Sequence, residues 1–141
     1  MAKLFQKVLD LQIIARDYQL KKSEHISWRK MTLKTFIFDI DGTICHSKDG
    51  NYNDAKPILN RIREINSLYE KGNTIIFNTA RGMGRYKNTA SQAHAAFYDL
   101  TVKQLESWGV KYHKLFMGKP SGDLYVDDKG INDEDFFNTN D

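Results

Sequence analysis

The sequence has one cysteine, Cys45, and two prolines in 141 residues, and it has no long apolar run. A single thiol excludes an internal disulfide and a zinc loop built from several cysteines. No stretch approaches the roughly 20 apolar residues of a membrane span. The first residues lack the charged start, apolar block and cleavage site of a secretory signal. These absences favour a cytoplasmic protein with no membrane partner.

The composition is that of an ordinary globular protein, because 40% of the residues are hydrophobic and 28% are charged. The net charge of +3 is unevenly distributed: residues 1–34 carry eight Lys or Arg against three Asp or Glu. We therefore divide the chain into a basic amphipathic helix with its linker, residues 1–33, and a main domain, residues 34–141.

Apolar residues recur at helical spacing near the amino terminus and predict an amphipathic helix over residues 3–21. Residues 23–31 are less regular and are interpreted as a link to the first strand. The apolar stripe of the helix has two possible uses, packing on its own domain or packing on a second subunit of a homo-oligomer. The basic charge suits either a solvated helix face or contact with a polyanion.

Short apolar runs alternate with helical patterns in the main domain. Strands are predicted at residues 35–38, 74–78, 112–117 and 124–126, with helices from Pro57 to Gly72 and over residues 88–108. A polar stretch at residues 47–54 is predicted to be a loop or short hairpin. The alternation indicates an α/β fold with a small Rossmann-like parallel sheet flanked by helices. The gaps between strands are too short for an inserted cap domain.

Two carboxylates follow the first predicted strand. In an extended chain, residues two apart point to the same side, so Asp39 and Asp41 can converge on one point. Gly42 permits a change of direction and Thr43 adds a hydroxyl. Two like charges this close favour a bound divalent cation, most simply Mg²⁺.

Polar residues also follow the other predicted strands: Thr79, Lys119 and the pair Asp127-Asp128. Each has an ordinary interpretation alone, as a helix cap, a surface lysine and a turn. However, the carboxyl ends of parallel strands meet at one edge of the sheet, where ligands bind. Their joint occurrence at these ends predicts an active site.

The ordered motifs Asp39-Ile-Asp41-Gly42-Thr43, Thr79, Lys119-Pro120 and Asp127-Asp128 resemble those of the haloacid dehalogenase-like (HAD) superfamily, over residues 35–130. The second carboxylate resembles the superfamily's phosphatases rather than its dehalogenases. The compact ending around Asp127 is similar to that of small phosphatases linked to capsular-polysaccharide biosynthesis.

This resemblance implies a phosphatase that works through an aspartyl-phosphate. Asp39 would be the nucleophile and Asp41 the general acid and base. Mg²⁺ would be held by Asp39, Asp127 and the backbone carbonyl of Asp41, with Asp128 ligating the ion or orienting its waters. The expected phosphate-binding residues are Gly42, Thr43, Thr79, Ala80, Arg81 and Lys119.

The chain departs from the superfamily in one spacing. Only seven residues separate Lys119 from Asp127, whereas a parallel crossover takes a dozen or more. Either an extended link crosses the sheet, or Lys114 or Lys129 takes the role of Lys119. The expected substrate is a sugar phosphate. Alternatives are the 3′ end of a polynucleotide, or no reaction at all in a binding subunit that uses the fold.

Overall fold

The computed structural model of the chain describes residues 1–30 and 32–138, with only the backbone course given for residues 20–30. The chain divides into two compact units, Met1–Leu33 and Lys34–Asp141. The first unit contains α1 (Ala2–Lys30), a single helix whose apolar side chains from Leu4 to Tyr18 are exposed. Within the described residues, no helix is long and apolar enough to span a membrane.

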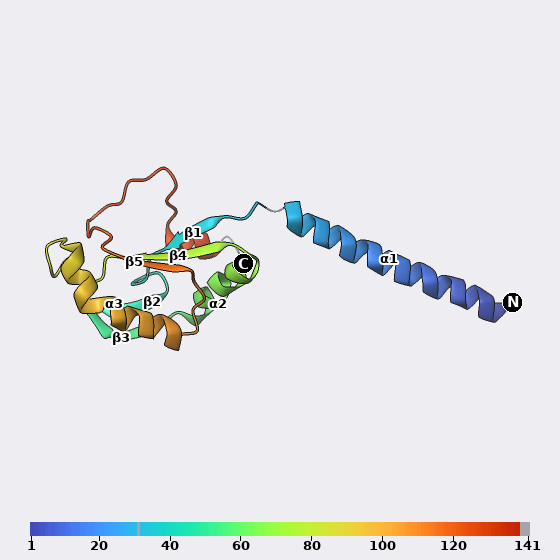
Figure 1. The fold of residues 1–141 in the computed structure, drawn as a ribbon, viewed down its shortest axis with the longest axis horizontal. Helices are drawn as coiled ribbons and strands as arrows, with labels where there is room; N and C mark the ends of the chain where they lie inside the picture. The colour runs from blue at the N-terminus through green and yellow to red at the C-terminus, as the bar shows by residue number, and fades with distance from the viewer. Residues whose placement is uncertain (31, 139–141) are drawn as a thin grey trace. The chain divides into compact units, whose positions relative to one another are not determined.

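The second unit is built on a three-stranded parallel sheet in the order β1 (Thr35–Phe38), β4 (Thr74–Thr79), β5 (Lys114–Met117) (Figure 1). Phe38, the last residue of β1, lies beside Phe77, and Phe77 lies beside Leu115. β4 and β5 continue for two more residues and end level with each other, at Thr79 and Met117. The connections contain α2 (Leu59–Glu70) and α3 (Ala90–Ser107). The predicted α/β class, with a parallel sheet flanked by helices and a helical extension at the amino terminus, is confirmed.

The two faces of this sheet differ in burial. Phe38, Ile75 and Phe77 point to one face and are buried. The helices α2 and α3 lie on this side (Figure 1). The short helix α4 (Asp133–Asn138) adds Phe137, whose ring stacks on Phe38. The core therefore lies between the sheet and these helices, as expected where apolar surface is removed from water on one face.

A two-stranded antiparallel hairpin, β2 (Cys45–Lys48) and β3 (Asn51–Pro57), follows the Asp39–Thr43 segment. Its turn is Asp49-Gly50, with both residues at positive φ, 48° and 74°. This backbone conformation matches the twist of a hairpin and favours an Asp-Gly pair. The polar stretch predicted as a loop or hairpin is thus a hairpin. Pro57, predicted to begin the following helix, is the last residue of β3, and that helix begins at Leu59.

Two sequence-based predictions are wrong. Residues 23–31 were expected to form a link between the amino-terminal helix and the first strand, but α1 continues to Lys30. Residues 124–126 form no strand; Leu124 and Val126 are 84% and 97% exposed. The apolar, β-branched composition favoured a strand, but a strand also needs a neighbour, and five residues after Lys119 do not bring this segment back along the sheet.

We call residues 121–132 the arm. Every residue of the arm is exposed, and the arm arches away from the sheet on the side opposite α2 and α3 (Figure 1). Both of its ends are fixed to the domain. Asn88 binds the backbone N–H of Ser121 at 2.8 Å and its carbonyl at 3.4 Å. At the other end, Asp133 in α4 pairs with Arg61 of α2 at 2.5 Å.

Candidate active site

Three of the predicted site residues lie at adjoining strand ends. Asp39 follows β1 directly, Thr79 is the last residue of β4, and Lys119 follows β5 by two residues. The backbone N–H of Lys119 donates to the carbonyl of Thr79 at 3.1 Å, which fixes the chain after β5 against β4. The parallel sheet thus produces the convergence that the motif order predicted.

The Asp39 carboxylate lies between a cation and a hydroxyl. The Nζ atom of Lys119 is 3.6 Å from Oδ1, and the hydroxyl of Thr43 donates to Oδ2 at 3.3 Å. Burial raises the pKa of Asp39 above its ordinary value, while the nearby charge of Lys119 acts in the opposite direction. Of the three candidate lysines, Lys119 is the one that forms an ion pair with Asp39 among the described residues.

Asp41 has a different partner, which is Arg81. The Nε and Nη2 atoms of Arg81 donate to the two oxygens of Asp41 at 2.9 and 3.1 Å. This paired arrangement is the strong, orientation-fixing form of an arginine–carboxylate contact. It connects the segment after β1 to the turn after β4 and holds the Asp41 side chain in one position.

The guanidinium of Arg81 is fully occupied inside the protein. Its side chain is 0% exposed. Besides Asp41, the group donates to Gln104 at 2.6 Å, to the hydroxyl of Thr101 at 3.2 Å, and to Sγ of Cys45 at 3.9 Å. All five N–H groups of an arginine thereby have acceptors. Arg81 was predicted to bind substrate, but in this arrangement it has no donor left for one and instead positions Asp41.

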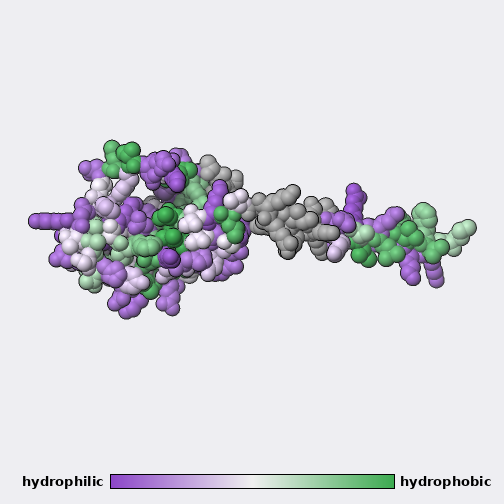
Figure 2. Space-filling view, turned by 45° about the horizontal axis from the view of Figure 1, so that its top comes forward, coloured by the Kyte–Doolittle hydropathy of each residue, from purple (hydrophilic) through white to green (hydrophobic). Residues whose placement is uncertain are grey.

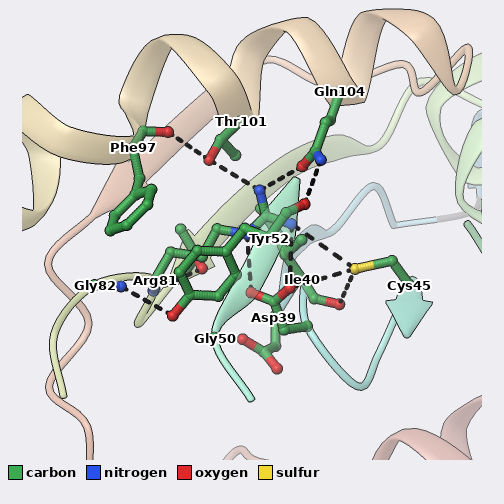
Figure 3. Close-up of polar contacts among 12 residues, drawn as sticks. Asp39, Ile40, Cys45, Gly50, Tyr52, Arg81, Gly82, Phe97, Thr101 and Gln104 are labelled. Atoms are coloured by element: carbon green, nitrogen blue, oxygen red, sulfur yellow. Dashed lines mark hydrogen bonds and ion pairs between the residues drawn. The ribbon is translucent and has the colours of Figure 1, made fainter. Parts of the chain in front are cut away.

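Residues of the hairpin and of α3 complete the environment of Arg81, and sequence reasoning missed them. The guanidinium lies 5.0 Å from the centroid of the Tyr52 ring. The Tyr52 hydroxyl accepts from the N–H of Gly82 at 3.1 Å, and its carbonyl accepts from Gln104 at 2.6 Å (Figure 3). Thr101 and Gln104 are three residues apart on α3, so they share a helix face. That polar pair within an otherwise apolar helix stripe was the available signal.

Three of the residues that were expected to bind the phosphate already make hydrogen bonds within the protein. Thr79 is buried, and its hydroxyl accepts from the backbone N–H of Arg81 at 3.1 Å. Ala80 is half-buried and its carbonyl accepts from Met83. Gly42, at φ 83°, donates its N–H to the carbonyl of Cys45 at 2.9 Å. Thr43, by contrast, is half-buried with its hydroxyl directed at Asp39.

The residues predicted to hold Mg²⁺ are not brought together in one chain. Asp127 and Asp128 belong to the exposed arm, whereas the other predicted ligands, Asp39 and the backbone carbonyl of Asp41, follow β1. Among the described residues, no three His, Cys, Asp or Glu side chains are grouped so that they could hold a metal ion. A hard divalent cation needs several oxygen ligands at once, so the side chains of this single chain do not fit the predicted metal site.

Comparison with known proteins gives a structural match. The crystal structure of a structural-genomics target from Vibrio cholerae matches with a TM-score of 0.68 and 25% sequence identity, over 74% of this chain and 87% of that one. No protein-family model and no curated protein matches the chain. The Vibrio structure carries no stated activity, so the similarity supports the α/β architecture.

Proposed function

We propose that this chain is a phosphatase that hydrolyses a phosphomonoester through an aspartyl-phosphate on Asp39, in the manner of the HAD-like superfamily that its motifs resemble. One observation carries the proposal: the Asp39 carboxylate lies at the carboxyl end of a parallel strand, 3.6 Å from the Lys119 ammonium. A carboxylate nucleophile beside a fixed cation suits phosphoryl transfer, which depends chiefly on positioning and on stabilising spread negative charge.

In the first step an oxygen of Asp39 attacks phosphorus, a new oxygen–phosphorus bond forms, and the bond to the leaving alkoxide breaks. Lys119 neutralises charge on the phosphoryl oxygens from the β5 side, and the Thr43 hydroxyl keeps the carboxylate oriented. In the second step water attacks the phosphorus of the aspartyl-phosphate, which releases phosphate and restores Asp39.

Asp41 is the residue placed to move protons, because it lies two residues beyond the nucleophile and Arg81 fixes its orientation. Both of its oxygens act as acceptors here. This suits the second step, in which a carboxylate takes a proton from the attacking water. To protonate the leaving group in the first step, one Asp41 oxygen must exchange its contact with Arg81 for a proton.

The substrate class proposed is a small phosphorylated metabolite such as a sugar phosphate. The described chain has only the hairpin and α2 between β1 and β4, and only a turn and α3 between β4 and β5, so no cap covers the site. An open site also admits large substrates, and residues 1–34 are rich in Lys and Arg. The 3′-phosphate of a polynucleotide is therefore the second candidate.

The test is phosphate release from a panel of sugar phosphates, nucleotides and 3′-phosphorylated oligonucleotides, with Mg²⁺ and with a chelator. Asp39→Asn is expected to abolish release. Asp49→Asn is the matched control, because Asp49 is an exposed turn residue at a positive φ that Asn also tolerates. Activity on oligonucleotides alone, falling steeply with salt, would favour the second candidate. No release from any substrate would favour the binding-subunit interpretation.

A further inference from the structure

The arm presents apolar side chains to solvent. Leu124, Tyr125, Val126 and Ile131 are 84%, 57%, 97% and 62% exposed. In Figure 2 a hydrophobic patch lies at the crest of this arch, at the upper margin of the domain. Tyr125 alone turns back, with its hydroxyl donating to the Pro120 carbonyl at 2.6 Å. Exposed β-branched and aromatic residues in an extended segment are the features of a strand without its neighbour.

The sheet presents the complementary surface. Among the described residues, no strand pairs with the outer edge of β1, so its backbone N–H and carbonyl groups on that side are available. The face opposite the helices is also open, with Ile37 and Phe116 65% and 51% exposed. A cleft of about 410 Å³ runs over this face, lined by Ile37, Ile76, Asn78, Phe116, Met117 and Gly118–Pro120.

We propose that the arm of one copy of this chain docks beside β1 of a second copy, as a reciprocal exchange that completes each active site with Asp127 and Asp128 of the other copy. The occupant of the open β1 edge is thus a second copy of this chain. In a parallel register with Val126 beside Ile37, Asp128 is level with Asp39. Leu124 and Val126 then share the open face with Ile37, because alternate strand residues point to the same side.

The arm cannot make the same pairing within its own chain. A parallel strand outside β1 must begin at the amino end of the sheet, which is about 13 Å along β1 and about 10 Å across from the end of β4. Asn88 holds Ser121 near the start of α3, and the three residues from there to Leu124 reach only about 10 Å. An antiparallel pairing would place Asp127 at the wrong end of the sheet.

Charge and symmetry support the second copy as the partner. Among the described residues, the site of one chain has a carboxylate nucleophile but too few acidic side chains for a cation, whereas its arm carries two exposed carboxylates. Each copy supplies one arm and one β1 edge, so a two-fold axis satisfies both copies in a closed dimer. Docking separates Tyr125 from the Lys119 ammonium, now 4.4 Å from its ring centroid, and buries two exposed aliphatic side chains in exchange.

The first test is the oligomeric state of the full chain by light scattering. The wild type is expected to be a dimer, and Leu124→Ser with Val126→Ser is expected to be a monomer with an unchanged circular dichroism spectrum. Leu59→Ser, at an exposed position on α2, is the matched control and should remain a dimer. A monomeric wild type, or a dimer that survives the arm substitutions but is lost on Leu4→Ser with Leu11→Ser in α1, overturns the proposal.

The second test rests on the proposed function and asks which copy supplies the arm. Asp39→Asn protein and Asp127→Asn/Asp128→Asn protein are each expected to be inactive. After mixing and subunit exchange, about a quarter of the wild-type rate should return, because half of the dimers are mixed and each mixed dimer holds one intact site. Mixtures that stay inactive although subunits exchange overturn the proposal. An inactive wild type refutes the proposed function instead, and the scattering test still decides on the exchange.

Discussion

The guanidinium of Arg81 hydrogen-bonds both carboxylate oxygens of Asp41, with Nε and Nη2 donating at 2.9 and 3.1 Å. The two residues are 40 positions apart and follow different strands, so this contact joins β1 to β4 at the site end of the sheet. It gives Asp41 a fixed orientation beside the proposed nucleophile. It also places a buried charge in the core, with consequences for stability.

Arg81→Met is expected to lower the free energy of unfolding by about 3 kcal/mol, because it leaves Asp41, Gln104 and Thr101 without their shared donor. Urea denaturation measures this change. Arg85→Met is the matched control from the same turn: Arg85 is exposed, and its contacts are a 3.5 Å hydrogen bond to the Gly50 carbonyl and a ring contact with Phe97. The control should change stability by less than about 0.5 kcal/mol. Equal losses in both variants would contradict a special role for Arg81.

Substitution of Asp41 separates its two possible proton transfers. Asp41→Asn is expected to slow hydrolysis of a sugar phosphate far more than that of an activated aryl phosphate, since only the poor leaving group needs a proton. Steady-state rates on the two substrates measure the difference. If both rates fall by the same factor, Asp41 acts only on the attacking water, which is the role that its present contacts with Arg81 suit best.

Lys119→Met is expected to reduce kcat/KM about a hundredfold, because it removes the cation next to the phosphoryl group. Lys114→Met, at an exposed position, serves as the control and should stay near the wild-type value. The pH dependence of kcat/KM gives a second measurement. Burial already raises the pKa of Asp39 and Lys119 lowers it, so loss of Lys119 should move the acidic limb of activity to higher pH. If the acidic limb of the pH profile does not move, Lys119 does not lower the pKa of Asp39.

Cys45 should behave as an inert thiol. It is completely buried, and burial, with the Asp41 carboxylate next to it, raises its pKa from 9.0 to about 12. Alkylation by iodoacetamide at pH 8 is expected to be slow in the native protein and fast in urea.

The same shift predicts a pH dependence of stability. The pKa of Cys45 is higher in the folded protein than in the unfolded chain. The contribution of Cys45 to the free energy of unfolding is therefore fully present below about pH 9 and is lost as the pH rises towards 12. Cys45→Ala should flatten this alkaline decline in urea denaturation. Rapid alkylation of the native protein, or an identical decline in the variant, would be inconsistent with the buried thiol.

The sequence was most informative where local pattern and burial agree. β1 at residues 35–38 matches its apolar run, and β4 and β5 follow in the predicted order. Phe38, Ile75 and Phe77 are buried because helices cover their face of the sheet. Gly72 and Gly109, at φ 96° and 70°, end α2 and α3 as glycine does after a helix. The placement of Asp39, Thr79 and Lys119 followed from strand order alone.

What the sequence did not show depends on contacts between distant segments. Arg81 was expected to face substrate, since nothing in its neighbourhood along the chain indicates that Thr101 and Gln104 of α3 would enclose it. Residues 124–126 have the composition of a strand, but a strand forms only against a partner, and the single chain offers none within reach. Amino-acid composition predicts the tendency of a segment to form a strand, and the length of the chain before the segment decides whether it can reach a neighbouring strand.

The most direct test of the phosphatase assignment is to look for the phosphoryl group on Asp39. The protein is mixed with the best substrate of the panel, quenched in acid within one turnover, digested and analysed by mass spectrometry. We expect one added phosphoryl group on the peptide that contains Asp39, and none in Asp39→Asn, which should also release no phosphate. Steady phosphate release with Asp39 unmodified, and undiminished in Asp39→Asn, would contradict the account.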